Sequence, residues 1–207
     1  LPVLLFGNIS NQRVIDLCAA PGGKTAQLVS RGADVTAVDR SPSRLNVLKK
    51  NLARLKLTAN LVNADVKDWR PCLPSQCVLL DAPCTGTGTI RRHPDILHLR
   101  GPEDVDRATA IQDSLLDSAV EMLAPGGILV FATCSLQPEE GIDRVLSLLA
   151  RRSDLVRVPV TQSDHKCLDP FITADGDIRT LPIYMAEQGG MDGFYATRLR
   201  RSNKVDR

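Results

Sequence analysis

Val14-Ile-Asp-Leu-Cys-Ala-Ala-Pro-Gly-Gly-Lys-Thr25 is the stretch that decides the fold of this chain. A short apolar run ends in a turn of small residues, and a helix is predicted over residues 24–30, stopped near Gly32. Residues 35–39 then form a second strand-like run. A strand, a tight turn, a helix and another strand make a βαβ unit, from which parallel sheets are built.

The alternation of strand and helix continues along the rest of the chain. Further strand-like runs cover residues 60–62, 77–81, 128–132, 155–158 and 194–199. Helices are predicted over residues 42–55, 102–123 and 138–152. Residues 159–192 are rich in Pro, Gly and Asp and are expected to form a lid or a mobile loop, and a strand is expected almost directly after Leu1. The pattern predicts an α/β fold with a doubly wound, mostly parallel sheet.

Composition narrows the classes of protein to which the chain can belong. Its 207 residues suit one domain, and with 43% hydrophobic but only 3% aromatic residues the core must be aliphatic. A net charge of +2 does not by itself indicate a nucleic-acid binder. The six cysteines are irregularly spaced, and the close pair Cys72 and Cys77 has no matching second pair, so neither a disulfide framework nor a zinc site is expected.

The expected setting is the cytoplasm, without a membrane. No apolar run approaches the roughly 18 residues that a membrane span requires. The chain begins at Leu1 and not at Met, so we expect a fragment that lacks an upstream part.

Acidic residues follow three successive strand-like runs. Asp39, Asp65 and Asp81 should lie at one edge of the sheet, beside the turn after the first strand. That turn matches neither a P-loop, which needs Gly where Cys18 stands, nor the Gly-x-Gly-x-x-Gly dinucleotide fingerprint. Three acids suit a ligand with a ribose, an adenine amine and a cationic centre, as in S-adenosylmethionine. Two simpler interpretations stay open: Asp39 could cap a helix, and Asp65 could belong to a plain turn.

Three ordered motifs resemble those of the RNA 5-methylcytosine methyltransferases of the NOL1/NOP2/Sun family. They are Asp16-Leu-Cys-Ala-Ala-Pro-Gly-Gly-Lys-Thr25, Asp81-Ala-Pro-Cys-Thr-Gly-Thr-Gly88 and Ala132-Thr-Cys-Ser135. The bacterial small-subunit rRNA members of that family are the most similar. The resemblance runs from about residue 13 to the end and includes Ile90-Arg-Arg-His-Pro-Asp95 and Gly193-Phe-Tyr-Ala196.

The resemblance implies a fold, a reaction and a cofactor. The fold would be the Rossmann-like class I S-adenosylmethionine-dependent methyltransferase fold, with a final antiparallel strand. Residues 1–207 would form one catalytic domain, without the upstream RNA-binding region that members of this group often carry. The reaction would transfer a methyl group to C5 of a cytosine in small-subunit rRNA.

A thiol has a clear purpose in this reaction. Cytosine C5 is a poor nucleophile, but a thiolate that adds to C6 moves electron density to C5, which can then attack the methyl group. The resemblance implies that Cys134 is this nucleophile, that Cys84 assists product release and that Asp81 binds the cytosine edge. DNA cytosine methyltransferases would nominate Cys84 instead. The implied cofactor contacts are Cys18, Ala19, Ala20, Pro21, Gly22, Gly23, Lys24, Asp39, Asp65 and Asp81.

The two cysteines are expected to lie together. In a methyltransferase-like strand order the fourth and fifth strands are neighbours, about 4.8 Å apart, so residues just past their ends can face one base. The simpler alternative is that each cysteine is a small buried hydrophobe. That alternative is favoured for the remaining cysteines, Cys18, Cys72, Cys77 and Cys167.

RNA contacts are expected next to the second motif. Residues 85–89 are rich in Gly and Thr and are predicted to form a flexible loop that leads into Arg91, Arg92 and His93. These cations could contact RNA phosphates, although a solvated surface loop is the competing interpretation. The target base must leave any stack to reach the thiols, so a single-stranded loop or bulge is the expected substrate.

Three rival functions stay open at this point. The substrate could be tRNA, or the chain could be an RNA-assembly module that binds S-adenosylmethionine but no longer catalyses. A small-molecule methyltransferase on the same fold is the third, for which a second cysteine would be superfluous. Protein partners and oligomeric state are not predicted.

Overall fold

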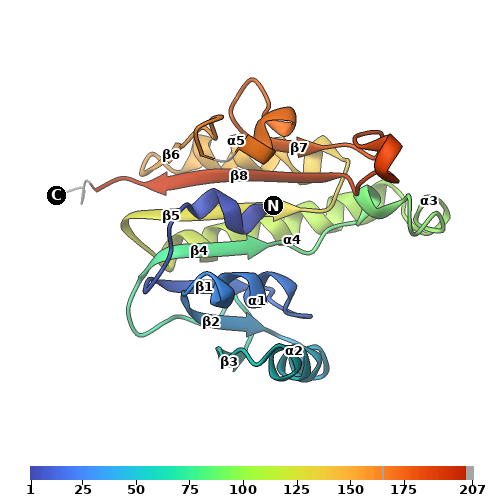
Figure 1. Cartoon of the computed structure of the whole chain (residues 1–207). Helices are drawn as coiled ribbons and strands as arrows, with labels where there is room; N and C mark the ends of the chain where they lie inside the picture. Colours follow the sequence, from blue (N-terminus) through green and yellow to red (C-terminus); the bar gives the residue numbers. More distant parts are fainter. Residues whose placement is uncertain (165, 204–207) are drawn as a thin grey trace.

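The computed structural model describes residues 1–164 and 166–203, which build one eight-stranded sheet flanked by helices (Figure 1). The strands are β1 (Arg13–Leu17), β2 (Asp34–Asp39), β3 (Asn60–Asn63), β4 (Ser75–Asp81), β5 (Leu123–Thr133), β6 (Leu155–Arg157), β7 (Ile178–Thr180) and β8 (Phe194–Arg201). The α-helices are α1 (Gly23–Ser30), α2 (Pro42–Leu55), α3 (Ile96–Leu99), α4 (Pro102–Glu121) and α5 (Ile142–Arg151). Short 3-10 helices cover Pro2–Phe6, Thr87–Thr89, Pro138–Glu140, Lys166–Phe171 and Ala186–Gln188.

The sheet has the order β3-β2-β1-β4-β5-β8-β6, and β7 pairs with β8 beside β6. Strands β1 to β5 pair in parallel, whereas β8 is antiparallel to β5. The predicted doubly wound, mostly parallel sheet with a final antiparallel strand is therefore confirmed. The chain order reverses between β1 and β4, and ligands bind open α/β sheets outside the carboxyl ends of the strands at such a point.

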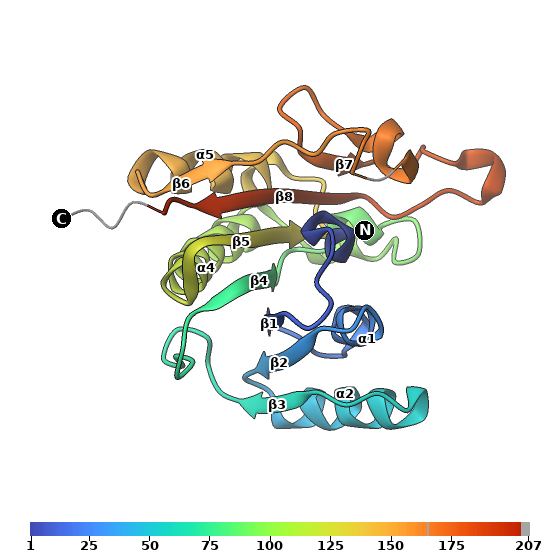
Figure 2. The same ribbon diagram turned by 60° about the vertical axis from the view of Figure 1, so that its left-hand side comes forward.

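Successive side chains of the central strands point to opposite faces of the sheet, and each face packs into its own part of the core. In β4, Val78 and Leu80 pack on one face with α4 and α5, whereas Cys77 and Leu79 pack on the other. Helix α1 and the N-terminal 3-10 helix cover that second face (Figure 2). Because both faces are covered, the central strands are mostly apolar, and the buried Asp16 of β1 is an exception.

Two expectations about irregular segments are wrong. Residues 2–6 form a 3-10 helix and not a strand; Pro2 cannot donate to a ladder, and Val3 and Leu5 are buried against the sheet. Residues 159–192, expected to form a lid or a mobile loop without regular elements, hold β7 and short helices, and a role as a lid stays a prediction. Buried Asp177 fastens this segment by accepting hydrogen bonds from the Tyr195 and Thr197 hydroxyls, at 2.6 and 2.5 Å.

The expected helix over residues 138–152 is broken at Gly141, which separates the 3-10 helix Pro138–Glu140 from α5. A Cβ atom on Gly141 would lie 3.1 Å from Cγ of Tyr195, so the chain passes close to β8 at this point. The predicted helices over residues 24–30 and 42–55 are confirmed, with Ser41 capping α2 through the Arg44 N–H. The helix predicted over residues 102–123 ends at Glu121, because Leu123 already pairs with Ser75 at the start of β5. No helix among residues 1–164 and 166–203 is long and apolar enough to cross a bilayer.

A buried acid joins β1 to α1. Asp16 is fully buried, and its Oδ2 accepts a hydrogen bond from the Thr25 hydroxyl at 2.6 Å. No group within residues 1–164 and 166–203 lies within hydrogen-bonding distance of its Oδ1. Burial raises the pKa of Asp16 to about 7.

We predict that Asp16→Asn makes the free energy of unfolding less dependent on pH. The pKa of Asp16 lies near 7 in the folded protein and near 3.8 in an ordinary carboxyl group, so the folded state keeps a proton that the unfolded chain releases. This contribution to stability is complete below pH 4 and is lost as the pH rises through 7. Urea unfolding at successive pH values should show the wild type losing stability relative to the variant; a constant difference would contradict the assignment.

Candidate active site

Two cavities lie at the carboxyl edge of the sheet, one on each side of the turn that follows β1. The smaller one, of about 240 Å³, lies beside Asp39 and Asp65. The larger one, of about 600 Å³, lies beside Asp81. The turn consists of small residues because it passes close to α2: a Cβ atom on Gly22, whose φ is +99°, would lie 2.7 Å from Cγ of Leu48.

Acidic, basic and apolar side chains together line the smaller cavity. Its lining residues are Cys18, Asp39, Arg40, Arg44, Asp65, Val66, Lys67, Pro83, Ile111 and Leu115. Asp39 is almost fully buried, and its carboxylate accepts hydrogen bonds from the Ala20 and Ser41 N–H groups at 3.1 and 2.9 Å. Asp39 therefore orders the turn and the start of α2 as well as forming a cavity wall. Asp65 accepts from the Lys67 N–H at 3.0 Å.

The residues predicted to contact a cofactor divide between the two cavities. Cys18, Asp39 and Asp65 line the smaller one. Ala19, Ala20, Pro21, Gly23, Lys24 and Asp81 line the larger one, whereas Gly22 is buried and lines neither. Burial raises the pKa of the Cys18 thiol to about 12, so Cys18 is a wall of the cavity and not a nucleophile.

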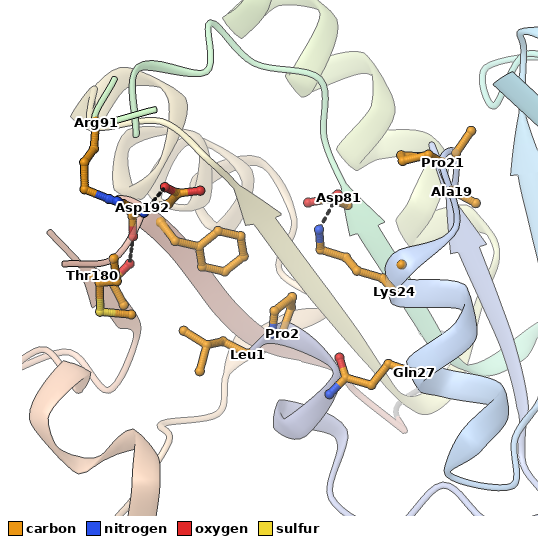
Figure 3. A pocket seen from close by; sticks show the side chains of 14 residues that line it. Leu1, Pro2, Ala19, Pro21, Lys24, Gln27, Asp81, Arg91, Thr180 and Asp192 are labelled. Carbon is orange, nitrogen blue, oxygen red and sulfur yellow. Dashed lines mark hydrogen bonds and ion pairs between the residues drawn. The ribbon is translucent and has the colours of Figure 1, made fainter. Parts of the chain in front are cut away.

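Lys24 and Asp81 form an ion pair that spans the gap between α1 and β4 (Figure 3). Lys24 Nζ lies 2.6 Å from Asp81 Oδ2 and 5.9 Å from the centroid of the Phe194 ring. Each side chain of the ion pair is about one-third exposed, and both line the larger cavity. A cation, a carboxylate and an aromatic face therefore meet in one space, which is the set of groups that could bind a nucleobase edge and its ring.

Cys84 and Cys134 lie side by side, as the predicted adjacency of their strands requires. The parallel register pairs Asp81 of β4 with Ala132 of β5, and the two sulfur atoms just beyond lie 3.4 Å apart. A hydrogen bond from the Cys84 thiol lowers the pKa of Cys134, while that same bond, followed by burial, raises the pKa of Cys84. These opposite shifts make Cys134 the more acidic of the two thiols.

The other cysteines only partly match the expectation of small buried hydrophobes. Cys77 is buried in β4, and burial raises its pKa to about 11. Cys72 and Cys167 are exposed, and both lie outside the strands of the sheet. Within residues 1–164 and 166–203, no three His, Cys, Asp or Glu side chains gather in a way that could hold a metal ion.

The expected flexible loop over residues 85–89 is instead tightly packed. The Thr85 side chain is buried, and the Gly88 N–H donates to the Cys134 carbonyl at 2.9 Å. The Gly193 N–H in turn donates to the Gly88 carbonyl at 2.7 Å. A Cβ atom on Gly88 would lie 2.0 Å from the Gly193 oxygen, so glycine allows the backbones to approach this closely.

The three basic residues predicted to contact RNA are exposed at the rim of the larger cavity or next to it. Arg91 lines the cavity, and Arg92 Nη2 forms an ion pair with Asp192 Oδ2 at 2.5 Å. That guanidinium holds the pKa of Asp192 below its usual range. His93 is exposed. Asp192 therefore partly compensates the positive charge of this rim, and the RNA contact remains a prediction.

Several residues of the site carry no recognisable signal in the sequence. Ile111 and Leu115 belong to the apolar stripe of α4 and resemble core positions, yet they line the smaller cavity. Phe194 and Asp192 reach the larger cavity from the end of the chain only because β8 returns beside β5. Only the exposure of Ile111, at 37%, separates it from the buried residues of the same stripe.

Comparison with known proteins assigns the chain to a family. The sequence profile of the family described as "16S rRNA methyltransferase RsmB/F" matches residues 3–200. A protein of Pseudomonas syringae pv. tomato named "Ribosomal RNA small subunit methyltransferase B" is 40% identical over 202 residues, which are 95% of this chain and 44% of that protein. Its namesake in Thermus thermophilus is 38% identical, over 93% of this chain and 46% of that protein. The chain thus spans less than half the length of these relatives.

Solved structures agree with the sequence comparison. NSun6 from Pyrococcus horikoshii, whose crystal structure was determined with SFG, superposes with a TM-score of 0.79 at 26% identity, over 99% of this chain and 52% of that one. A methyltransferase homologue from the same organism superposes with a TM-score of 0.74 at 28% identity, over 97% of this chain and 65% of that one. The sheet described above is therefore the Rossmann-like methyltransferase fold, and the chain belongs to the 16S rRNA methyltransferase RsmB/F family.

Proposed function

We propose that this chain is the catalytic unit of an S-adenosylmethionine-dependent methyltransferase that modifies cytosine C5 in small-subunit rRNA. The observation that carries the proposal is the pair of sulfur atoms, 3.4 Å apart, at the same sheet edge as the cavity that Asp39 and Asp65 line. The family and the names of its ribosomal RNA methyltransferases support rRNA as the substrate class. Residues 1–207 would act as one catalytic unit.

The smaller cavity fits the nucleoside part of S-adenosylmethionine. Asp39 and Asp65 offer carboxylate oxygens to hydroxyl and amine groups, while Val66, Ile111 and Leu115 offer apolar surface to an adenine ring. The turn at Cys18 to Lys24 leaves backbone groups open to the remainder of the molecule because it lacks bulky side chains. When bound, this cofactor supplies the methyl group on an electrophilic sulfonium.

Cys134 provides the nucleophile. Its thiolate adds to C6 of the cytosine, and the electron pair of the C5–C6 double bond becomes available to C5 for bonding to the methyl carbon. After methyl transfer the C5 proton leaves, the S–C6 bond breaks and the double bond re-forms. The hydrogen bond from Cys84 favours this reaction because it lowers the pKa of Cys134.

Cys84 acts after methyl transfer, in the step that releases the product. While Cys134 is a thiolate, Cys84 keeps its proton because it donates a hydrogen bond to that charge. Once the Cys134 sulfur is bonded to C6 the charge is gone, and Cys84 no longer gains from staying protonated. Cys84 can then ionise and accept the C5 proton, directly or through water, so that the Cys134 thiolate is expelled.

The target base would enter the larger cavity. Lys24, Asp81 and Phe194 supply a cation, a carboxylate and an aromatic ring there. A base inside a stack could not reach the sulfur atoms, so the substrate cytosine must be flipped out or unpaired. Arg91, Arg92 and His93 at the rim would contact the phosphates on either side, and RNA would compete with Asp192 for the Arg92 guanidinium.

We predict opposite effects from removing the two cysteines. Cys134→Ala should lower methyl transfer by at least about a thousandfold, because no thiolate remains to add to C6. Cys84→Ala should accumulate a covalent protein–RNA adduct that survives denaturation, and adduct formation should shift to higher pH because the pKa of Cys134 loses its lowering contact. Labelled cofactor, separate rRNA and tRNA pools and denaturing gels measure both effects.

Cys72→Ala is the matched control, since Cys72 is an exposed thiol that does not contact Cys84 or Cys134. It should behave as the wild type does. Full activity of Cys134→Ala would overturn the covalent mechanism, and labelling of tRNA alone would overturn the substrate. Cofactor binding without methylation of either pool would favour the silent RNA-assembly module.

We also predict that Asp65→Asn weakens S-adenosylmethionine binding by roughly tenfold, because a hydrogen bond to a charged acceptor contributes about 1.5 kcal/mol or more. Isothermal titration calorimetry measures the dissociation constant. Asp68→Asn is the matched control, as Asp68 is an exposed acid three residues further on that does not line the cavity. Equal affinities of the two variants would show that Asp65 belongs only to a turn.

A further inference from the structure

Glu140 is a fully buried carboxylate that contacts the segments carrying both cysteines. Its Oε1 accepts hydrogen bonds from the Thr85 N–H at 2.9 Å and from Gln112 Nε2 at 3.1 Å. Its Oε2 accepts from the Ser135 hydroxyl at 2.6 Å and from the Thr85 hydroxyl. Four donors from three different segments of the chain thus converge on one side chain.

The charge of Glu140 has no cationic partner among the ion pairs of residues 1–164 and 166–203. A buried carboxylate is costly unless hydrogen bonds satisfy it, and here N–H and O–H donors alone do so. An ion pair would neutralise the charge locally. Because no ion pair within this part of the chain neutralises it, the negative charge of Glu140 acts on neighbouring titratable groups and raises the pKa of Cys84.

Three of the four donors belong to Thr85 and Ser135, which are sequence neighbours of the two cysteines. Thr85 directly follows Cys84, and Ser135 directly follows Cys134. Glu140 therefore holds each cysteine through the next residue in the chain. The break at Gly141 makes this possible, since Glu140 ends a separate 3-10 helix instead of lying inside α5, and its carbonyl accepts from the Thr133 hydroxyl at 3.1 Å.

We propose that Glu140 is a positioning residue that holds the Cys84 and Cys134 sulfur atoms in hydrogen-bonding contact and makes Cys84 the partner that keeps the proton. This inference rests on the proposed function for its role in catalysis. The bridging carboxylate fixes both turns against each other, while its negative charge raises the pKa of Cys84 alongside the larger effects of the Cys134 contact and burial. Glu140 touches neither sulfur within hydrogen-bonding distance and so acts through Thr85 and Ser135.

Other charged groups also face the sulfur pair. Asp81 opposes and Lys24 favours the ionisation of Cys134, and Arg92 at the rim interacts with the same sulfur. Glu140 faces Cys84 instead. A change at Glu140 should therefore alter which cysteine ionises first, whereas a change of the rim charges should alter mainly Cys134.

The test uses thiol alkylation by iodoacetamide on the whole chain, without RNA, with peptide mass spectrometry to read each cysteine across a pH series. In the wild type Cys134 should react at least about tenfold faster than Cys84 near neutral pH, because the thiolate is the reactive form. Glu140→Gln should reduce this ratio to within about threefold, since it removes the charge and loosens the sulfur contact.

Glu139→Gln is the matched control, because it removes the same charge one residue earlier from an exposed side chain. It should keep the wild-type ratio and pH profile. If Glu140→Gln does not fold, Ser135→Ala replaces it, because this variant removes the bond between Glu140 and the Cys134 segment, together with the contacts of the Ser135 hydroxyl to the Thr87 hydroxyl and the Gln137 N–H, and should also reduce the ratio.

A wild-type alkylation ratio in a folded Glu140→Gln variant would overturn the proposal, even if its melting temperature fell, because Glu140 would then be merely structural. In methyl-transfer assays the proposal expects kcat to fall by about tenfold or more with an unchanged dissociation constant for S-adenosylmethionine. The alkylation result needs neither RNA nor methyl donor. It can therefore stand if the proposed reaction fails, and it can fail while the proposed reaction stands.

Discussion

The parallel pairing of β4 with β5 is the constraint on which the site depends. It sets Asp81 opposite Ala132, so that the chain leaves the two strands at the same level. Cys84 and Cys134 follow just beyond, and their sulfur atoms lie 3.4 Å apart. The same edge faces the turn after β1, where the strand order reverses. The pair of thiols and the smaller cavity therefore become neighbours as a consequence of strand order, although their motifs lie far apart in the sequence.

Buried polar contacts then convert this proximity into a defined geometry. Glycine at position 88 lets the segment after Cys84 approach the Cys134 carbonyl, and Glu140 holds that segment to the one after Cys134. On the other side, Lys24 and Asp81 join α1 to the end of β4. Unsatisfied groups would be costly around the buried Glu140, so the contacts of this carboxylate restrict the conformations that the site can adopt.

Much of the fold and the location of the site could be predicted from the sequence. Apolar runs that end in Asp39, Asp65 and Asp81 indicated the sheet edge, and the strand order placed the cysteines together. Local pattern could not reveal that Gly141 breaks the helix and brings Glu140 inward, nor that the Gly- and Thr-rich segment after Cys84 is packed. Those features depend on contacts with β8 and with residues more than fifty positions away, such as Glu140 with Thr85. The sequence likewise indicated Lys24 only as a cofactor contact of the turn, whereas its ammonium group extends to Asp81.

The central claim is that Cys134 forms the bond to the RNA base and Cys84 helps to break it. The most direct measurement is to incubate the whole chain with S-adenosylmethionine and small-subunit rRNA that carries 5-fluorocytidine, which cannot lose a proton from C5, and to map the trapped adduct by peptide mass spectrometry. The account predicts that the modified base is attached to Cys134. Attachment to Cys84, or methylated product formed without any adduct, would contradict it.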